Sequence, residues 1–334
     1  MMTDEDVAAV VREVQEALQP NAQAPAAGGR AADKGNRRVI LPSGKTTNDE
    51  SCALALRALA NSPDLFRRAR VACIVHNDAR GAEILSPEAA RSIVDTVAKV
   101  WKWKCGRDGS YALSPYAQTS TDHAKLWLAS QHVVELRPLA ILSRCPILIS
   151  DGTRAKILRQ GYHPEMGGVL VAGGGDAADL TLAEAKEKLL DELLGEFRFQ
   201  TPSDLSRAVA CALAPAMILG MTSKSRVPAA FIEAGEEQTG KGFYARCVRH
   251  IYCEADAVAV TKARGGVGSF DESLQSALVR GRPFILLENL RGTMDSEFLE
   301  SCMTEDCINC RAPGKSSVDV DPRRFVWQLT SNGV

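Results

Sequence analysis

The sequence predicts an α/β protein whose C-terminal part contains a parallel sheet, and three observations support this fold class. After Pro228, short apolar strands alternate with helical patterns, which is typical of parallel sheets with helical connections. A glycine-rich loop separates the first of these strands from its helix. The chain has 334 residues, of which 45% are hydrophobic and 24% charged, so it is long enough to bury one large or two medium cores.

Charge and composition exclude several classes of protein. Lys+Arg total 40 against 41 Asp+Glu, so the formal net charge is -1 and a uniformly basic wrapper of nucleic acid is excluded. The N-terminus is acidic where a signal peptide would be positive, and no stretch reaches the roughly 18 unbroken apolar residues of a membrane span. We therefore expect a cytoplasmic protein with no membrane segment, whose 10 cysteines are reduced.

Residues 1–36 predict an N-terminal helix followed by a flexible linker. Valine and leucine recur at helical spacing over residues 4–18, whereas residues 20–36 are rich in Ala, Gly and Pro and have little to bury. The helix is either a partner-docking element or a frayed extension of the chain.

Residues 37–175 predict a smaller α+β accessory domain. Thr47 and Glu50 form a capping-box pair before one helix, and Pro87 occupies the first turn of another. The predicted elements are strands at 39–41, 71–75 and 146–149 and helices at 52–60 and 86–100. Residues 43–47 (SGKTT) lack the first glycine of a phosphate loop, so we interpret them as the turn and cap before the first helix.

Alternating tryptophans and lysines at residues 101–104 predict a strand with two different faces. On a strand, Trp101 and Trp103 point to one side and Lys102 and Lys104 to the other. We interpret the tryptophan side as part of the core, and the alternative is a stacking or phosphate-contacting edge for DNA.

Residues 176–224 predict a helical connector between the two domains. Thr181 and Glu184 form a second capping box, which indicates the start of a helix. A longer and more buried helix is expected over residues 203–219.

The motif that carries the functional prediction lies in residues 225–334. An apolar strand at 229–232 runs into G-x-x-x-x-G-K and then into a helical pattern at 243–252. In such a loop the backbone N–H groups surround a phosphate, and Lys241 neutralises β- and γ-phosphate oxygens. The Ser or Thr that normally follows the lysine and ligates magnesium is replaced by Gly242. The candidate phosphate-binding residues are Gly235, Glu236, Glu237, Gln238, Thr239, Gly240, Lys241, Gly242 and Phe243.

Two later apolar strands end in polar residues. The strand at 283–287 ends in Glu288 and Asn289, and a carboxylate there reaches magnesium beside the phosphates, as a Walker B acid does. The strand at 324–329 is followed by Asn332. We expect Asn289 or Asn332 to orient the attacking water. A strand at 258–260 and a helix at 270–280 complete the predicted α/β order.

These segments resemble a known family. EAGEEQTGKGFYARCVRHIY, KARGGVGSFDESL, RPFILLENLRG and FVWQLTSNG are similar to the P-loop ATPase module of primase–helicase-type proteins of phages and mobile elements, in the AAA+ and superfamily-three helicase neighbourhood. Because SRCPILISDG and GYHPEMGG resemble the segment before that ATPase, the resemblance covers roughly residue 140 to the end.

The resemblance implies a P-loop NTPase core that binds ATP and Mg²⁺ and performs ATP-driven work on DNA. It also implies a homo-oligomer, with a hexameric ring as the expected form. Carried over by position, Gly235, Gly240 and Lys241 bind phosphate, Glu288 holds magnesium and Asn332 is the sensor. Lys262 and Arg264 follow the second strand, where ring ATPases place loops toward DNA, so they are the candidate DNA contacts.

Several positions depart from the family pattern. Glu288 replaces the usual Asp, Asn289 stands where a catalytic Glu is common, and Gly242 lacks a hydroxyl. Hydrolysis is therefore expected to be slow or to take its base from elsewhere. Since the chain ends just after Asn332, we expect an AAA+-like core that is incomplete at its C-terminus, without a last strand, an arginine finger or a lid.

The sequence thus predicts an ATP-binding and ATP-hydrolysing motor module that acts on DNA. The alternative is a nucleotide-binding regulatory or interaction protein with little or no turnover, which Gly242 and Asn289 favour. A third hypothesis is a metal-binding scaffold, because Cys302, Cys307 and Cys310 have the C-x4-C-x2-C spacing of iron–sulfur ligands. No Cys or His follows Cys310 to supply the fourth ligand.

Overall fold

The structure is a computed structural model with an α/β fold. It divides into two compact units. The first contains residues 1–76 and 83–139, and the second contains residues 77–82 and 140–334. The residues that it describes are 37–76, 81–115, 117–150, 155–173, 179–222, 226–235, 239–254, 258–260, 269–290, 294–311 and 317–331. The N-terminal helix predicted at 4–18 and the linker after it lie outside these ranges.

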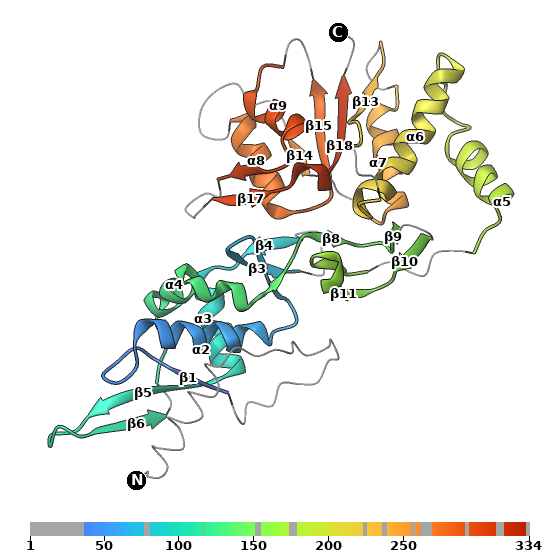
Figure 1. Ribbon diagram of the computed structural model, residues 1–334. Coiled ribbons are helices and arrows are strands. Elements are labelled where there is room, and N and C mark those ends of the chain that lie inside the picture. The colour runs from blue at the N-terminus through green and yellow to red at the C-terminus, as the bar shows by residue number, and fades with distance from the viewer. Residues whose placement is uncertain are drawn as a thin grey trace. The chain divides into compact units, whose positions relative to one another are not determined.

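The first unit combines two sheets with three α-helices in its described residues (Figure 1). One sheet has the order β1-β5-β6 and the other β4-β3-β2-β7. Trp127 is fully buried in the core that the helices share with Val39 and Val100. The elements are β1 (Arg38–Ile40), α2 (Asn48–Ala60), β2 (Leu65–Arg68), β3 (Val71–Val75), β4 (Ala82–Ile84), α3 (Pro87–Val97), β5 (Lys99–Cys105), β6 (Tyr111–Pro115), α4 (Thr121–Ala129), the 3-10 helix η1 (Gln131–Glu135) and β7 (Arg137–Pro138).

The predicted capping box precedes α2 and the predicted proline opens α3, but α2 begins at Asn48 and not at residue 52, and α4 was not predicted. The Thr47 side chain accepts a hydrogen bond from Glu50 N, and the Glu50 carboxylate accepts one from Thr47 N, which is the predicted capping box. The end of α3 was predicted wrongly. The helix stops at Val97 because Lys99–Cys105 instead form β5, where Val100 pairs with Val39 of β1.

The strand β5 has the two faces that the Trp–Lys alternation predicted. Trp103 is buried and Trp101 is half-buried, whereas Lys102 and Lys104 are exposed. Trp103 packs with Ile40, Leu54 and Leu113 in a small hydrophobic cluster. The interpretation of the tryptophan side as core is therefore confirmed.

The second unit contains a parallel sheet, several small sheets and the helices around them (Figure 1). Its elements are β8 (Ile141–Ser143), β9 (Ile147–Ser150), β10 (Ala155–Leu158), β11 (Gly161–His163), η2 (Pro164–Met166), β12 (Val169–Val171), α5 (Leu182–Glu187), the π-helix η3 (Lys188–Leu193), α6 (Pro202–Leu219), β13 (Ala230–Glu233), α7 (Lys241–Ile251), β14 (Val258–Val260), α8 (Phe270–Arg280), β15 (Phe284–Leu290), α9 (Glu297–Thr304), β16 (Ile308–Cys310), β17 (Val318–Val320), η4 (Pro322–Arg324) and β18 (Val326–Ser331). None of its described helices, nor any in the first unit, is long and apolar enough to cross a membrane.

The boundary between the units differs from the one predicted near residue 175. The chain divides between residues 139 and 140, so β8 to β12 belong to the second unit. Ile147 and Val171 from these small sheets share one hydrophobic core with Ala212 of α6, Tyr244 of α7 and Val326 of β18. This sharing is a long-range contact that composition along the chain does not reveal.

The four-stranded sheet of the second unit is parallel throughout and has the order β13-β18-β15-β14. Phe284, Ile285 and Leu287 are almost fully buried, as expected for a strand with neighbours on both sides. Two strand limits were predicted wrongly. β15 continues to Leu290, and β18 begins only at Val326 because Asp321 caps a 3-10 turn over residues 322–324.

A glycine allows α6 to pack against the hairpin strand β9. A Cβ atom added at Gly220 would overlap the carbonyl oxygen of Leu148 and lie 2.9 Å from its carbonyl carbon. Because the obstacle is backbone, it cannot rotate away. We expect Gly220→Ala to destabilise the second unit by about 1–3 kcal/mol, measured by urea unfolding.

The matched control for this substitution is Gly173→Ala. A Cβ atom there would lie 3.5 Å from the Arg144 carbonyl oxygen, which is an ordinary contact. An equal loss of stability in both variants would show that the close approach of α6 to β9 is not the cause.

Buried polar contacts connect α7 and the residues just after it to the sheet. Arg249, which is 5% exposed, donates from Nη1 to Gln328 Oε1 at 2.9 Å, and Gln328 Nε2 donates to the Ala245 carbonyl at 3.3 Å. Glu254, just after the helix, forms a buried ion pair with Arg282 at 3.2 Å. Buried charges require such partners, so these contacts fix the register of α7 on β15 and β18.

Candidate functional site

The residue directly before α7 is a glycine in a left-handed conformation. Gly240 has φ +92, a left-handed conformation that favours glycine, and it directly precedes the first residue of α7, Lys241. Among the described residues, apart from the chain neighbours and the backbone of α7 itself, no heavy atom lies within 4 Å of a Cβ position built on Gly235 or Gly242. The described part of the chain therefore leaves room for a side chain at both positions.

The N-terminus of α7 differs from those of the other α-helices in the described residues. Each of the others starts with a side-chain oxygen that accepts a hydrogen bond from a first-turn N–H group. Gly240 has no such side chain, so the first N–H groups of α7 have no side-chain cap. The capping residues of the other helices are Thr47, Ser86, Ser120, Thr181, Thr201, Ser269 and Ser296.

Lys241 lies at this uncapped end. Its Nζ donates to Thr239 Oγ1 at 3.2 Å, which places the ammonium group over the loop and not along the helix. The helix macrodipole and the lysine therefore contribute positive charge at the same place. This combination favours an anion.

α7 is held in position by two tyrosines that contact α6. Tyr244 Oη donates to the Ala208 carbonyl and Tyr252 Oη to the Ala212 carbonyl, both at 2.8 Å. Burial raises the pKa of Tyr252 to about 12 and also raises the pKa of Tyr244. Both hydroxyls therefore remain protonated donors at neutral pH, and they fix the axis of the helix that begins at the loop.

Aromatic rings surround the start of α7. Phe243, 59% exposed, stacks on Phe197 with ring centroids 6.0 Å apart, and Phe197 meets Tyr244 edge-on at 5.5 Å. The Phe197 ring also lies next to Gly240, since a Cβ atom there would be 3.8 Å from it. Phe197 was not among the predicted site residues because it lies 38 positions before Gly235, the first residue of the loop.

Glu288 lies at an irregularity in the sheet. β15 pairs with β18 in regular register up to Leu287 and Leu329, and pairing resumes at Leu290 and Ser331. Glu288 and Asn289 therefore both face Thr330, which is the arrangement of a β-bulge. A bulge turns side chains away from the regular alternation, and Ser331 Oγ holds its far side by donating to the Leu290 carbonyl at 3.1 Å.

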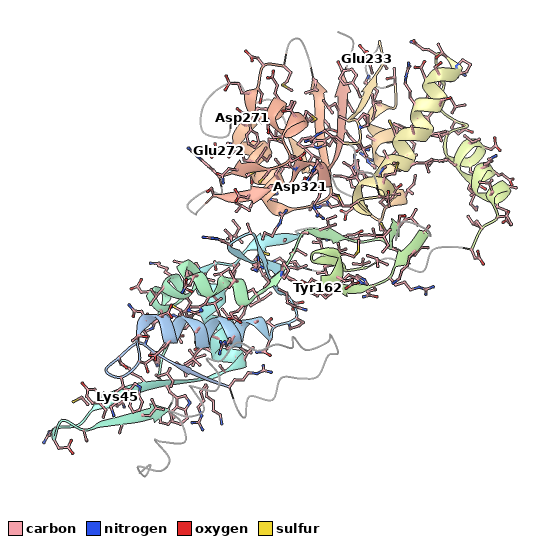
Figure 2. The ribbon with its side chains drawn as sticks, viewed as in Figure 1. Lys45, Tyr162, Glu233, Asp271, Glu272 and Asp321 are labelled. Carbon is pink, nitrogen blue, oxygen red and sulfur yellow. The ribbon has the colours of Figure 1, made fainter. Side chains whose placement is uncertain are left out.

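The carboxyl ends of three strands meet at one edge of the sheet. Glu233 of β13 pairs with Ser331 of β18, and Ser331 pairs with Leu290 of β15. Figure 2 shows Glu233 at this edge, toward which the arrowheads of β15 and β18 point. The end of β13, from which the loop starts, and the bulge at Glu288 of β15 therefore lie at the same carboxyl edge of the sheet, with β18 between them. Glu233 was also missed, although it is an acidic residue at the last position of β13.

Several predicted site residues lie outside the described part of the chain. These are Glu236, Glu237 and Gln238 of the loop, the candidate DNA contacts Lys262 and Arg264, and the sensor candidate Asn332. Of Asn289 only the backbone, within β15, is described.

The three cysteines of the C-x4-C-x2-C motif differ in burial. Cys302 and Cys310 are buried and Cys307 is exposed. Burial, more than the neighbouring Cys310 and Asp271, raises the pKa of the Cys302 thiol to about 12, so it keeps its proton at neutral pH. Within the described ranges no group of three or more His, Cys, Asp or Glu residues could hold a metal ion.

Comparisons with known proteins find little similarity to this chain. No known protein family model matches the chain, and no curated protein does. Two solved structures are similar to this chain. "The A form apo structure of NrS-1 C terminal region-CTR" is 12% identical, with 81% of this chain and 53% of that chain covered and a TM-score of 0.39. "The apo structure of NrS-1 C terminal region (305-718)" is 11% identical, with 80% of this chain and 54% of that chain covered and a TM-score of 0.38. The chain thus spans about half the length of these structures, and its function must be argued from its own residues.

Proposed function

We propose that the second unit is a P-loop NTPase core of AAA+-like type that binds ATP at the loop between β13 and α7. The observation that carries this proposal is the uncapped start of α7, where left-handed Gly240 and Lys241 stand at the carboxyl edge of a parallel sheet. Ligands of open α/β sheets bind outside the carboxyl ends of the strands, and phosphates bind at helix N-termini.

Each residue has a defined task in this proposal. The N–H groups at the start of α7 donate to phosphate oxygens, and the Lys241 ammonium exchanges its contact with Thr239 for the β- and γ-phosphates. Glu288, turned by the bulge, would hold Mg²⁺ together with the phosphates. The metal supplies neutralisation of the charge that develops on the transferred phosphoryl group. Asn289 or Asn332 is assigned to orienting the water.

The strand order supports the choice of this NTPase class. The loop-bearing strand β13 lies beside β18, and β15, which carries Glu288, follows it. A strand between the loop and the acidic strand leaves room for a polar group, assigned to Asn332, at the γ-phosphate. By its resemblance to primase–helicase ATPases, the unit would use ATP for work on DNA, as a homo-oligomer whose expected form is a hexameric ring.

A two-part measurement tests the proposal. Binding of a fluorescent ATP analogue is measured with and without Mg²⁺, and phosphate release is measured with and without DNA. Saturable, Mg²⁺-dependent binding and DNA-stimulated release are the expected results. Absence of nucleotide binding would overturn the site, whereas binding without release would overturn only the motor.

Gly242 favours a second candidate function, which is nucleotide-dependent regulation with little turnover. A glycine cannot supply the hydroxyl that normally completes magnesium coordination after the lysine. Since a Cβ atom at Gly242 meets no other described part of the chain within 4 Å, a larger residue fits there. We expect Gly242→Thr to tighten Mg²⁺-dependent binding and to raise phosphate release about tenfold, which corresponds to about 1.4 kcal/mol of transition-state stabilisation.

The control for this substitution is Gly242→Val, which has the same shape as threonine without the hydroxyl. Equal rates for the threonine and valine variants would show that the missing hydroxyl does not limit turnover. A threonine variant with tighter binding but no release would favour the regulatory function.

A further inference from the structure

Positive charge exceeds negative charge in the part of the first unit that the structure describes. Residues 37–76 and 83–139 contain 14 Lys and Arg against 9 Asp and Glu, whereas the chain as a whole has 40 against 41. Within this unit, residues 99–115 hold the cations Lys99, Lys102, Lys104 and Arg107 and the single acid Asp108. The β5–β6 hairpin therefore has a strong local charge of one sign.

The hairpin is a regular antiparallel ribbon with a closed tip. Trp101 to Cys105 pair with Pro115 to Tyr111 without interruption. At the tip, Gly106 N donates to the Ser110 carbonyl at 2.7 Å and Gly109 N donates to the Gly106 carbonyl at 3.1 Å. Figure 1 shows the far ends of β5 and β6 extending beyond the helices of this unit. The ribbon is thus a projecting element.

One face of the ribbon is braced by the loop between β1 and α2. Trp103 N donates to Ser43 Oγ at 3.2 Å and Trp103 Nε1 to Thr46 Oγ1 at 2.9 Å. The Lys45 ammonium lies over the Trp103 ring at 5.5 Å, and Figure 2 shows Lys45 beside the ribbon. Arg38 lies over Trp101 in the same way at 5.2 Å. These contacts hold two cations on the tryptophan face.

The opposite face carries lysines. Lys102 and Lys104 are exposed and project from it, and Arg107 is exposed at the tip. No ion pair involves any of these three within the described residues. Lys102 lies near α4, because its charge, after burial, lowers the pKa of His123 there. Asp108 is occupied in accepting hydrogen bonds from Ser110 N and Oγ within the tip.

We propose that the β5–β6 hairpin is a binding site for duplex DNA, with the ribbon in the major groove and its cations on the phosphates of both walls. Three features favour this ligand: cations on both faces, a rigid ribbon that projects from its unit, and the absence of paired acids beside Lys102, Lys104 and Arg107 in the described chain. The major groove of B-DNA, about 12 Å wide, admits a two-stranded ribbon. The proposal does not depend on the nucleotide site in the other unit.

The test is fluorescence anisotropy of a labelled 20-bp duplex, measured with the full chain at several salt concentrations and without nucleotide. Replacing Lys102, Lys104 and Arg107 with alanine is expected to weaken binding about 30- to 100-fold. It should also reduce the slope of log K against log salt by about 3, since each lost phosphate contact removes about 0.9. The matched control removes three exposed cations of the second unit, Lys156, Lys186 and Arg198, and should leave the slope unchanged.

Binding of other nucleic acids, measured in the same way, tests whether the site prefers duplex DNA. Double-stranded RNA is expected to bind more weakly, because its major groove is too narrow to admit the ribbon. Equal weakening by both triple variants would overturn the proposal by showing a general charge effect, and so would tighter binding of single strands than of the duplex. Lys241→Ala should leave nucleotide-free binding intact, so failure at the nucleotide site and failure at the hairpin are separate outcomes.

Discussion

The Lys241→Ala variant is expected to bind ATP roughly 10- to 150-fold more weakly than the parent protein. This range corresponds to the loss of hydrogen bonds to a charged group, which contribute about 1.5–3 kcal/mol. Lys241 is the ammonium at the uncapped start of α7, and its substitution leaves Gly240 and the α6 contacts of the helix in place. Titration with a fluorescent ATP analogue measures the change directly.

Arg246→Ala is the matched control for this prediction. Arg246 is an exposed cation on the same helix, one and a half turns after Lys241. Its loss removes the same net charge without touching the loop. If both variants lost affinity to the same extent, attraction by the whole helix would explain binding and the assignment of Lys241 to the phosphates would be wrong.

Glu254→Gln is expected to destabilise the second unit by about 3–5 kcal/mol. Its carboxylate forms an ion pair with Arg282 at 3.2 Å, and the two side chains are only 4% and 9% exposed. Neutralising the acid leaves the guanidinium buried without its counter-charge, and an uncompensated buried charge strongly lowers the free energy of unfolding. Hydrogen exchange of the α7 and β15 amides in urea measures the effect in this unit alone.

Two further variants make this prediction specific. Glu187→Gln removes a charge from an exposed position on α5 and should change stability by no more than about 0.5 kcal/mol. The double replacement Glu254→Leu with Arg282→Met should recover most of the loss, because apolar residues of similar volume can replace a buried ion pair. A double variant as unstable as Glu254→Gln would mean that the ion pair is not the cause.

Much of the local structure could be predicted because short-range chemistry determines it. The capping boxes at Thr47 and Thr181 each depend on residues three apart, and both are present. The α6 and α8 limits follow from caps and helical periodicity in the same way. The predicted order of strands and helices is confirmed from β13 to β15 for the described residues, because apolar runs bounded by turns are local signals, whereas the β16–β17 hairpin before β18 was not predicted.

Other features could not be predicted because they depend on pairing. The premature end of α3 results from β5 joining β1, a partner about 60 residues away. The bulge at Glu288 arises only where β15 and β18 are compared residue by residue. Phe197 reaches Gly240 and Phe243 through packing of separate segments.

By itself, the sequence determined the α/β class, the strand–loop–helix motif whose helix begins near Lys241, and the two faces of the Trp–Lys strand. These depend on backbone preferences and side-chain periodicity within a few residues. Only the tertiary structure decided that β8 to β12 share a core with α6 and α7, that the loop and Glu288 leave one edge of the sheet, and that cations gather on a projecting hairpin. Burial and pairing bring distant residues together, and no local pattern records which partner a strand selects.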